Sequence, residues 1–187
     1  DVYAGYLAKK IGLPINKFVV ATNQNDILHR AIANGAYNVE NVLETISPSM
    51  DIQIASNFER LIFDLNDRSD KKTIDVMKSI KEKGKYEIQK GSLDKINVNF
   101  LSSRMNENEV LNTIKTVYEK FDKVLDPHSA IGYGAFDKVN LKGNNIVLAT
   151  AHPCKFPGAI EKAIYIKSEL PNELSFILDE KENYDII

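Results

Sequence analysis

Two polar segments follow directly after short apolar runs that have the composition of buried strands. The first is ATNQND, residues 21–26, at the end of the β-branched run 18–22. The second is ATAHPCKF, residues 149–156, at the end of the apolar run 145–150. Ligands of open α/β sheets bind beyond the carboxyl ends of the strands, so both segments are candidates for a binding site.

Hydroxyl, amide and ammonium groups in these segments set the chemistry that such a site could carry. The Thr150 hydroxyl could make one fixed hydrogen bond to a ligand, and the Lys155 ammonium could meet an anion. A structural alternative stands beside this interpretation, and spacing alone favours it. In that alternative Thr150 caps the turn after its own strand, and Asn23 or Asp26 caps the next helix.

A third segment combines serine, proline and arginine in a way that suits anion binding. Ser47 and Ser49 flank a proline, and a helix is expected to begin at Asp51. The free N–H groups at a helix start attract anions. Asn57 and Arg60 stand three residues apart on one helix face, where the guanidinium could form a fork to a phosphate. An ordinary helix cap with a surface arginine explains the same residues, and without further information it is the preferred explanation.

The sequence lacks the motifs of several other classes of reaction. The histidines, His29, His128 and His152, show no H-x-x-x-H spacing, and Cys154 is the single cysteine, so neither a metal site nor an intrachain disulfide is predicted. There is no serine nucleophile elbow, no Walker loop and no complete G-x-G-x-x-G. The G-x-G at 132–134 is too short for such a motif and indicates close helix packing instead.

The composition is that of one globular domain. The chain has 187 residues, 43% hydrophobic and 27% charged, with 24 basic and 26 acidic side chains and a net charge of −2. This charge gives no electrostatic reason to expect a nucleic acid or a membrane surface as a partner. No apolar run approaches the roughly 18–20 residues of a membrane span, and the N-terminus lacks the layout of a signal peptide. Together with the single cysteine, these features predict a cytoplasmic protein.

Helical periodicity dominates the chain, and only two strands are clear. We expect strands at 18–22 and 145–150, in an α/β fold whose short parallel strands are flanked by helices. Asp1 is a good N-cap for a helix that begins at once, and two strands are few for such a sheet, so further strands are expected before residue 1. No pattern decides 84–105 or the tail, 168–187. Helices are expected at 2–11, 27–34, 50–66, 67–83, 106–121, 128–138 and 158–167, the 106–121 helix being opened by the capping-box pattern Asn106-x-x-Glu109.

Five segments, in this order, resemble the C-terminal part of threonine synthase, a pyridoxal-phosphate (PLP) enzyme of fold type II, the tryptophan-synthase-β type. They are DVYAGYLAKKIGLPI, ATNQNDIL, SPSMDIQIASNFERLIF, LDPHSAIGYGAF and LATAHPCKFPGAIEKA. The resemblance covers most of residues 1–167, and T-A-H-P-x-K-F after a strand is its most specific motif. It is weakest over 67–105, a variable region expected to be mainly helical. Residues 1–187 are accordingly expected to be a single fragment, the C-terminal part of a PLP-binding catalytic domain.

The resemblance implies which residues would meet the cofactor. In the family, a Ser-Gly-Asn-Phe-Gly loop that cradles the cofactor phosphate directly precedes the residue matching Asp1. The lysine that forms the Schiff base also lies upstream, so no catalytic residue is expected in this chain. Asp1 would belong to the phosphate cradle through its backbone, and Thr150 would hydrogen-bond the pyridine nitrogen. A neutral hydroxyl at that place would not enforce protonation of the ring.

The same resemblance implies the residues of the substrate side. Those expected to line it are Ser49, Asp51, Asn57, Arg60 and Lys155. Ser129 stands where a small hydroxyl residue or alanine is expected, so little changes there. Cys154 replaces what is often alanine, which should alter packing only slightly.

For the whole enzyme, the resemblance implies conversion of O-phospho-L-homoserine and water to L-threonine and phosphate, the last step of threonine biosynthesis, with PLP as the electron sink. The fragment alone is expected to be inactive, because it needs the N-terminal part of the same protein. Two alternatives stay open: another lyase of this fold, such as a threonine-dehydratase-like enzyme, and a non-catalytic ligand-binding or structural homologue. The SPSMDI and NFER segments argue against a dehydratase, whose substrate carries no phosphate. A sheet cut through its middle exposes an edge, so association or partial disorder is expected, especially near residue 1.

Overall fold

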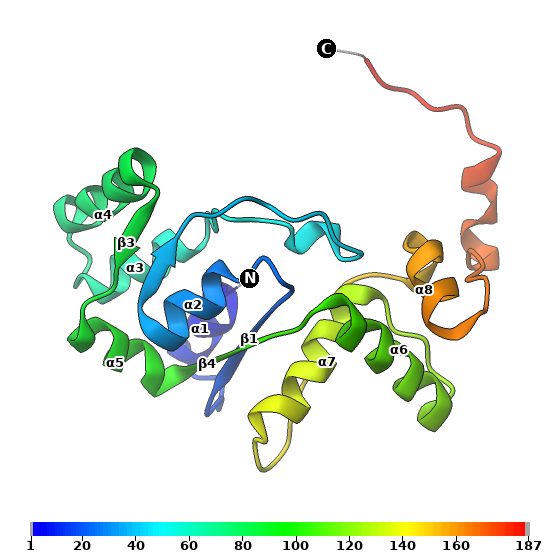
Figure 1. Cartoon of the computed structure of the whole chain (residues 1–187), viewed down its shortest axis with the longest axis horizontal. Helices are drawn as coiled ribbons and strands as arrows, with labels where there is room; N and C mark the ends of the chain where they lie inside the picture. The colour runs from blue at the N-terminus through cyan, green and yellow to red at the C-terminus, as the bar shows by residue number, and fades with distance from the viewer. Residues whose placement is uncertain (1, 186–187) are drawn as a thin grey trace.

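A two-stranded parallel sheet lies at the centre of the computed structural model, which describes residues 2–185 (Figure 1). β1 (Phe18–Thr22) pairs with β4 (Phe100–Arg104) along its whole length, and Phe18 stands opposite Phe100. The ring centroids of these two phenylalanines are 5.2 Å apart, so the register brings large apolar side chains together on one face. The expected strand at 18–22 is confirmed, and its partner lies where no sequence pattern indicated an element.

Helices and a short antiparallel ribbon surround this sheet in the N-terminal part of the chain. They are α1 (Val2–Lys10), α2 (Ile27–Asn34), α3 (Phe58–Leu65), α4 (Asp70–Lys83) and α5 (Lys90–Asn99), with β2 (Ala36–Asn38) antiparallel to β3 (Lys85–Glu87). The core that they enclose contains side chains at most 2% exposed, among them Ile32, Tyr37, Phe58, Leu61 and Phe100. The region 67–105 is mainly helical, as expected, but it also supplies β3 and β4.

A second core forms among the helices of the C-terminal part, to the right in Figure 1. These elements are α6 (Glu107–Phe121), α7 (Pro127–Val139), the 3-10 turn η2 (Pro153–Lys155), α8 (Pro157–Ile164) and the 3-10 helix η3 (Asn172–Leu178). The capping box is confirmed: Glu109 N–H donates to Asn106 Oδ1 at 3.0 Å, and Asn106 N–H donates to Glu109 Oε2 at 2.7 Å. Close packing at the G-x-G is also confirmed, because a Cβ at Gly134 would collide with the Met105 side chain.

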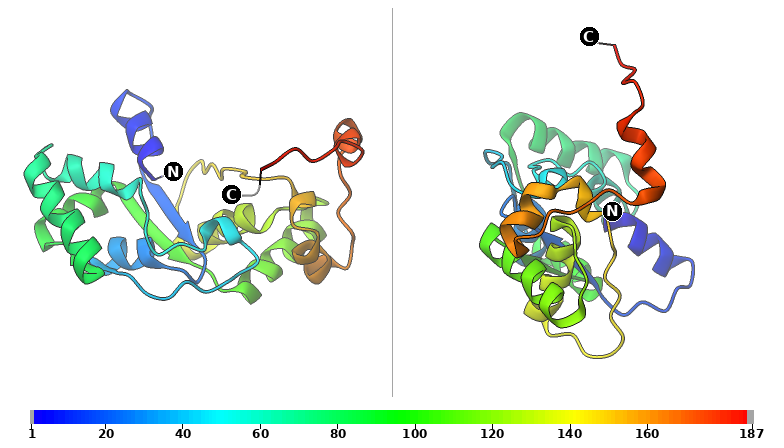
Figure 2. Two further views of the ribbon diagram at one scale, coloured as in Figure 1. Left: turned by 90° about the horizontal axis from the view of Figure 1, so that it is seen from above. Right: turned by 90° about the vertical axis from the view of Figure 1, so that its right-hand side faces the viewer.

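The strand expected at 145–150 is not formed. These residues run as an extended trace from the end of α7 to η2 and pair with no strand of residues 2–185 (Figure 2). Ile146 is 89% exposed and Leu148 74%, whereas Val147 packs against Gly132 of α7. A strand needs a neighbour for its backbone N–H and C=O groups, and no described segment supplies one.

The helix expected from residue 50 begins only at Phe58, after the 3-10 turn η1 (Pro48–Met50). The Asp51 carboxylate does not cap a helix, because it accepts from the Thr45 N–H at 2.8 Å and from the Thr45 hydroxyl at 2.6 Å. Asp26 does not cap the next helix with its side chain either, so that part of the structural alternative is wrong. Its carboxylate forms an ion pair with Arg30 at 2.8 Å instead.

Two other helices are shorter than expected because the backbone takes the left-handed conformation at their ends. Asp67 and Arg68 have φ of 55° and 59°, so α4 begins at Asp70, with Ser69 as its N-cap. Tyr165 has φ of 59° and ends α8, which was expected to continue to residue 167.

Within residues 2–185, no helix is long and apolar enough to cross a membrane. The same residues contain no group of three or more histidine, cysteine, aspartate or glutamate side chains that could hold a metal ion. The absence of a bound metal stays a prediction. The same is true of the association expected near residue 1, because Asp1 lies outside the described residues.

Candidate active site

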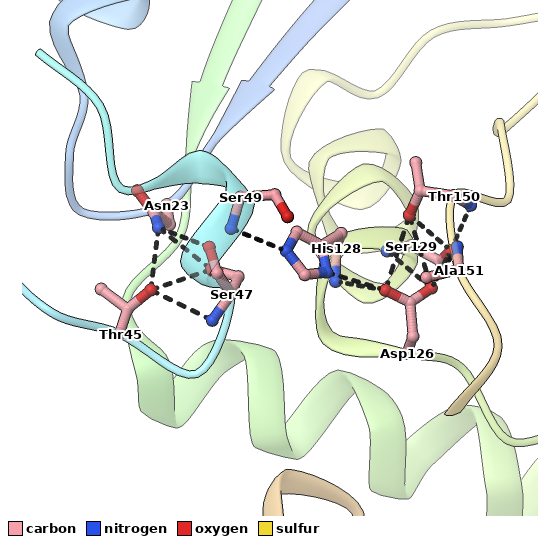
Figure 3. Close-up of polar contacts among 9 residues, drawn as sticks. All are labelled: Asn23, Thr45, Ser47, Ser49, Asp126, His128, Ser129, Thr150 and Ala151. Atoms are coloured by element: carbon pink, nitrogen blue, oxygen red, sulfur yellow. Dashed lines mark hydrogen bonds and ion pairs between the residues drawn. The ribbon is translucent and has the colours of Figure 1, made fainter. Parts of the chain in front are cut away.

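The loop after β2 is tied to the end of β1 by a cluster of polar side chains, Asn23, Thr45, Ser47 and Asp51, which we call the loop cluster. Figure 3 shows the first three of these side chains. Asn23 Nδ2 lies 2.9 Å from Thr45 Oγ1, 3.0 Å from Ser47 Oγ and 2.7 Å from Asp51 Oδ1. Asn23, Thr45 and Ser47 are buried, and Asp51 is half-buried. Hydrogen bonds inside this cluster fix the loop from both ends, so Asp51 acts first as a structural anchor.

The loop cluster presents the Pro48–Met50 turn to α7. Ser49 is exposed, and its backbone N–H donates to His128 Nε2 at 3.3 Å. His128 lies in the first turn of α7 and is 5% exposed. The contact joins the polar end of β1 to a second polar group, which is centred on the start of α7.

This second group, which we call the carboxylate cluster, consists of Asp126, His128, Ser129, Thr150 and Ala151 (Figure 3). Asp126 is the N-cap of α7 and is 1% exposed. Its Oδ1 accepts from the His128 N–H and from Nδ1, both at 2.9 Å. Its Oδ2 accepts from the Ser129 hydroxyl, from the Ser129 N–H at 3.3 Å and from the Ala151 N–H at 3.4 Å. One carboxylate therefore holds His128 with one oxygen and Ser129 and Ala151 with the other.

Burial alone would raise the pKa of the Asp126 carboxyl group. The hydrogen bonds that it accepts from Ser129 and His128 outweigh burial and hold this pKa below its ordinary value. Asp126 is thus ionised at neutral pH and can only accept hydrogen bonds. The His128 Nδ1 must then carry a hydrogen, and its Nε2 accepts from Ser49, which assigns the neutral tautomer with the hydrogen on Nδ1.

Thr150 is held at an exposed position by the carboxylate cluster. Its backbone N–H donates to Ser129 Oγ at 2.9 Å, and its Oγ1 lies 3.2 Å from the same atom. Its Oγ1 is also 3.4 Å and 3.5 Å from the two Asp126 oxygens. The Thr150 hydroxyl therefore bonds to α7 and not to the turn after its own segment, which corrects the structural alternative raised from spacing. An exposed hydroxyl with a fixed orientation is suited to a single directed hydrogen bond with a ligand.

The other expected site residues lie in several places. Lys155 is exposed in η2, where its N–H donates to the His152 carbonyl at 3.1 Å. Asn57 directly precedes α3, and its Oδ1 is buried without a hydrogen-bond partner within residues 2–185. Arg60 lines a hollow of about 290 Å³ with Tyr3, Glu59, Phe63 and Thr73. The structure thus joins Ser49, Asp51 and Thr150 through the two clusters, and it does not bring Arg60 into either of them.

Sequence reasoning missed Asp126 and His128 as members of this site. The segment Asp126-Pro127-His128-Ser129 has the pattern of a helix start with an aspartate N-cap and proline at the first helical position. That pattern indicates a cap, but it does not reveal that the same carboxylate reaches Thr150, 24 residues further along the chain.

The family model for the C-terminal domain of threonine synthase matches residues 129–187. Threonine synthase of Pseudomonas aeruginosa is 38% identical over 100% of this chain and 40% of its own length. The crystal structure of PLP-bound threonine synthase from Brucella melitensis superposes with a TM-score of 0.93 and 41% identity, covering 100% of this chain and 40% of that one. Yeast threonine synthase gives a TM-score of 0.88 at 36% identity, with 97% and 41% covered. The chain spans about 40% of the length of these relatives.

The superposition on these structures over nearly the whole chain, together with the parallel pair β1 and β4 among helices, places this chain in the fold class of the PLP enzymes of fold type II. Within that class, the chain is similar over its whole length to the C-terminal part of threonine synthase. The resemblance that five sequence segments indicated is confirmed.

Proposed function

We propose that this chain is the C-terminal part of a threonine synthase, which converts O-phospho-L-homoserine and water to L-threonine and phosphate. The observation that carries the proposal is its similarity, over the whole chain, to a PLP-bound threonine synthase at 41% identity. The exposed and fixed hydroxyl of Thr150 supports the same function from the structure of this chain. The single cysteine further supports a cytoplasmic enzyme.

Thr150 fits the ring end of the cofactor, pyridoxal 5′-phosphate. Thr150 is exposed, whereas Ser129 and Asp126 behind it are buried, so one hydrogen bond can be formed on the outer side with the pyridine nitrogen. PLP supplies an electron sink when it is bound. The phosphate would be held by backbone N–H groups of a loop that ends at Asp1, which lies outside the described residues.

Ser49, Asp51, Asn57, Arg60 and Lys155 are proposed to line or support the substrate side. Ser49 is exposed on the turn that the loop cluster holds against His128, so its hydroxyl is available to a phosphate or carboxylate. Lys155 is exposed five residues after Thr150 and brings a positive charge to the same segment. Asp51 would act by fixing the Ser49 turn.

A further polypeptide segment is proposed to complete the site, with the Schiff-base lysine and the glycine-rich phosphate loop. Two apolar surfaces support this. Residues 145–150 expose Ile146 and Leu148, and α1 has no buried residue, with Leu7 49% exposed. Exposed apolar runs of this kind mark contacts with other polypeptide. On this proposal the chain alone is inactive.

Turnover by the intact protein, including the sequence proposed to precede Asp1, tests this function. We expect release of phosphate and L-threonine from O-phospho-L-homoserine, and borohydride reduction is expected to attach PLP to one lysine outside residues 1–187. Deamination of threonine without turnover of phosphohomoserine would favour a dehydratase. No lysine adduct and no turnover would favour a non-catalytic homologue, and a single adduct within residues 1–187 would contradict the proposed division of the site.

A further inference from the structure

Asp126 is a buried anion that forms no ion pair with a lysine or arginine among residues 2–185. Its side chain is 0% exposed, and the only ion-pair contact that it makes within residues 2–185 is with His128. His128 is neutral in the tautomer assigned above, because its Nε2 accepts from the Ser49 N–H. Burying an ionised carboxylate is costly unless it is paired or well hydrogen-bonded. A positive charge bound near Asp126 would therefore be stabilised.

The direction of each hydrogen bond around Thr150 can be assigned. Ser129 has one hydroxyl hydrogen, and it is donated to Asp126, which is ionised and can only accept. Ser129 Oγ is then an acceptor toward Thr150, whose N–H donates to it at 2.9 Å. The remaining groups near Thr150 Oγ1 are the two carboxylate oxygens of Asp126, which also accept.

These acceptors favour an inward direction for the hydroxyl hydrogen of Thr150. Every described group within 3.2 Å to 3.5 Å of Thr150 Oγ1 can accept a hydrogen bond, and we assign the hydrogen to this inward side. The exposed side of Oγ1 then presents lone pairs. That side is complementary to a donor, such as a protonated ring nitrogen, and not to an unprotonated one.

We propose that Asp126 is a positioning residue that acts through Ser129 and Thr150, so that Thr150 Oγ1 accepts a hydrogen bond from a protonated heteroaromatic nitrogen. The identity of that ring as pyridoxal phosphate rests on the proposed function. Thr150 is a neutral hydroxyl, but the anion behind it supplies the charge that favours the protonated ring. This differs from the expectation, drawn from the hydroxyl alone, that ring protonation would not be enforced.

The nitrogen-15 resonance of ring-labelled PLP bound to the intact protein tests this inference directly. In the unaltered protein we expect the chemical shift of a pyridinium nitrogen at pH 7.5. In Asp126→Asn the pH at which the nitrogen loses its proton is expected to fall by about 1–3 units, the range for removing an opposite charge a few ångströms away. Ser129→Ala keeps the Asp126 carboxylate and removes the hydroxyl that connects it to Thr150. It should lower the pH at which the nitrogen loses its proton as well, but by less.

Asp137→Asn is the matched control, because it removes an exposed carboxylate from the same helix, α7. It should leave the resonance unchanged. An unprotonated nitrogen in the unaltered protein would overturn the inference even if Asp126→Asn failed to fold. Equal resonances in the unaltered protein and in Asp126→Asn would also overturn it and leave the proposed function standing. Failure of the unaltered protein to bind PLP would overturn both.

Discussion

β1 and residues 145–150 are similar in composition but lie in opposite environments. Both are short runs of β-branched and apolar residues that lead into a polar segment. β1 has a parallel partner along its whole length, whereas residues 145–150 pair with no strand of residues 2–185. Because strand propensity largely expresses packing against neighbours, one composition gives a strand in the first place and an exposed extended segment in the second.

The ends of the two segments are also fixed by different means. The Thr22 carbonyl at the end of β1 accepts from the Met105 N–H at 3.0 Å, so the neighbouring strand holds it. Thr150 is held by the Ser129 hydroxyl, which in turn donates to Asp126. A buried carboxylate at a helix start can thus position a hydroxyl at the end of an extended segment that has no strand partner.

The largest effect on stability is expected where β1 pairs with β4, a contact that residues 145–150 lack. Phe100→Ala should lower the free energy of unfolding by about 3–5 kcal/mol, because the Phe100 ring is 1% exposed and packs against Phe18 and Tyr6. Urea unfolding followed by circular dichroism measures the change. Leu148→Ala is the control in the unpaired segment, at 74% exposure, and should change it by less than about 0.5 kcal/mol. Equal losses of unfolding free energy would mean that residues 145–150 are packed as firmly as the β1–β4 pair.

The second-largest effect on stability is expected at Asp126, the carboxylate that holds Thr150 through Ser129. Asp126→Asn should cost about 2 kcal/mol at pH 7, because an acceptor of charge-assisted hydrogen bonds is replaced by an amide whose NH₂ faces donors. The pKa of Asp126 lies below its ordinary value of 3.8 in the folded chain. Its stabilising contribution is therefore complete above that value and is lost as the pH falls through the lower, folded pKa.

Urea unfolding of both proteins between pH 7 and pH 3 measures this contribution. The difference in unfolding free energy between the unaltered chain and Asp126→Asn should be constant down to about pH 4 and shrink below it. Asp137→Asn should show no comparable gap at pH 7. A gap that widened toward acid would contradict the assigned direction of the shift.

Sequence patterns located the local elements well and the long-range contacts poorly. The helix opened by Asn106 and Glu109 was predictable because its capping box lies within four residues. β4 has the sequence FLSSR, whose small polar residues do not indicate a strand, and only its pairing with β1 makes it one. Thr150 was proposed from its place at the end of the run 145–150 and from the family resemblance, and its role stays a prediction. Asp126 was not proposed, since its reach to residue 150 depends on how α7 packs.

A smaller effect is expected at the end of β1, from the loop cluster. Asn23→Ala removes the amide that joins Thr45, Ser47 and Asp51 and leaves their oxygens without that donor. We expect a loss of about 1–1.5 kcal/mol in unfolding free energy, since these groups are largely buried but keep some bonds to one another. Amide hydrogen exchange should quicken at Ser49, whose N–H donates to His128. Protection at Ser49 that survived unchanged would mean that His128 alone holds the turn.

The smallest effect on the stability of this chain is expected at Ile146. Its size in the chain and in the intact protein tests whether another segment covers residues 145–150. Ile146→Thr keeps β-branching and should change the unfolding free energy of the chain by less than about 0.5 kcal/mol, because the side chain is 89% exposed. Val20→Thr, the corresponding change in β1, should cost about 1–2 kcal/mol, because Val20 packs against the core and the new hydroxyl is desolvated.

In the intact protein the two substitutions should lower the unfolding free energy by similar amounts. If a further segment covers residues 145–150, as proposed, Ile146 is buried there and Ile146→Thr should also cost about 1–2 kcal/mol. The measurement is the same urea unfolding, made on the chain and on the intact protein in parallel. A cost below about 0.5 kcal/mol in both would show that this segment stays exposed, and the strand-like composition of residues 145–150 would then need another cause than burial.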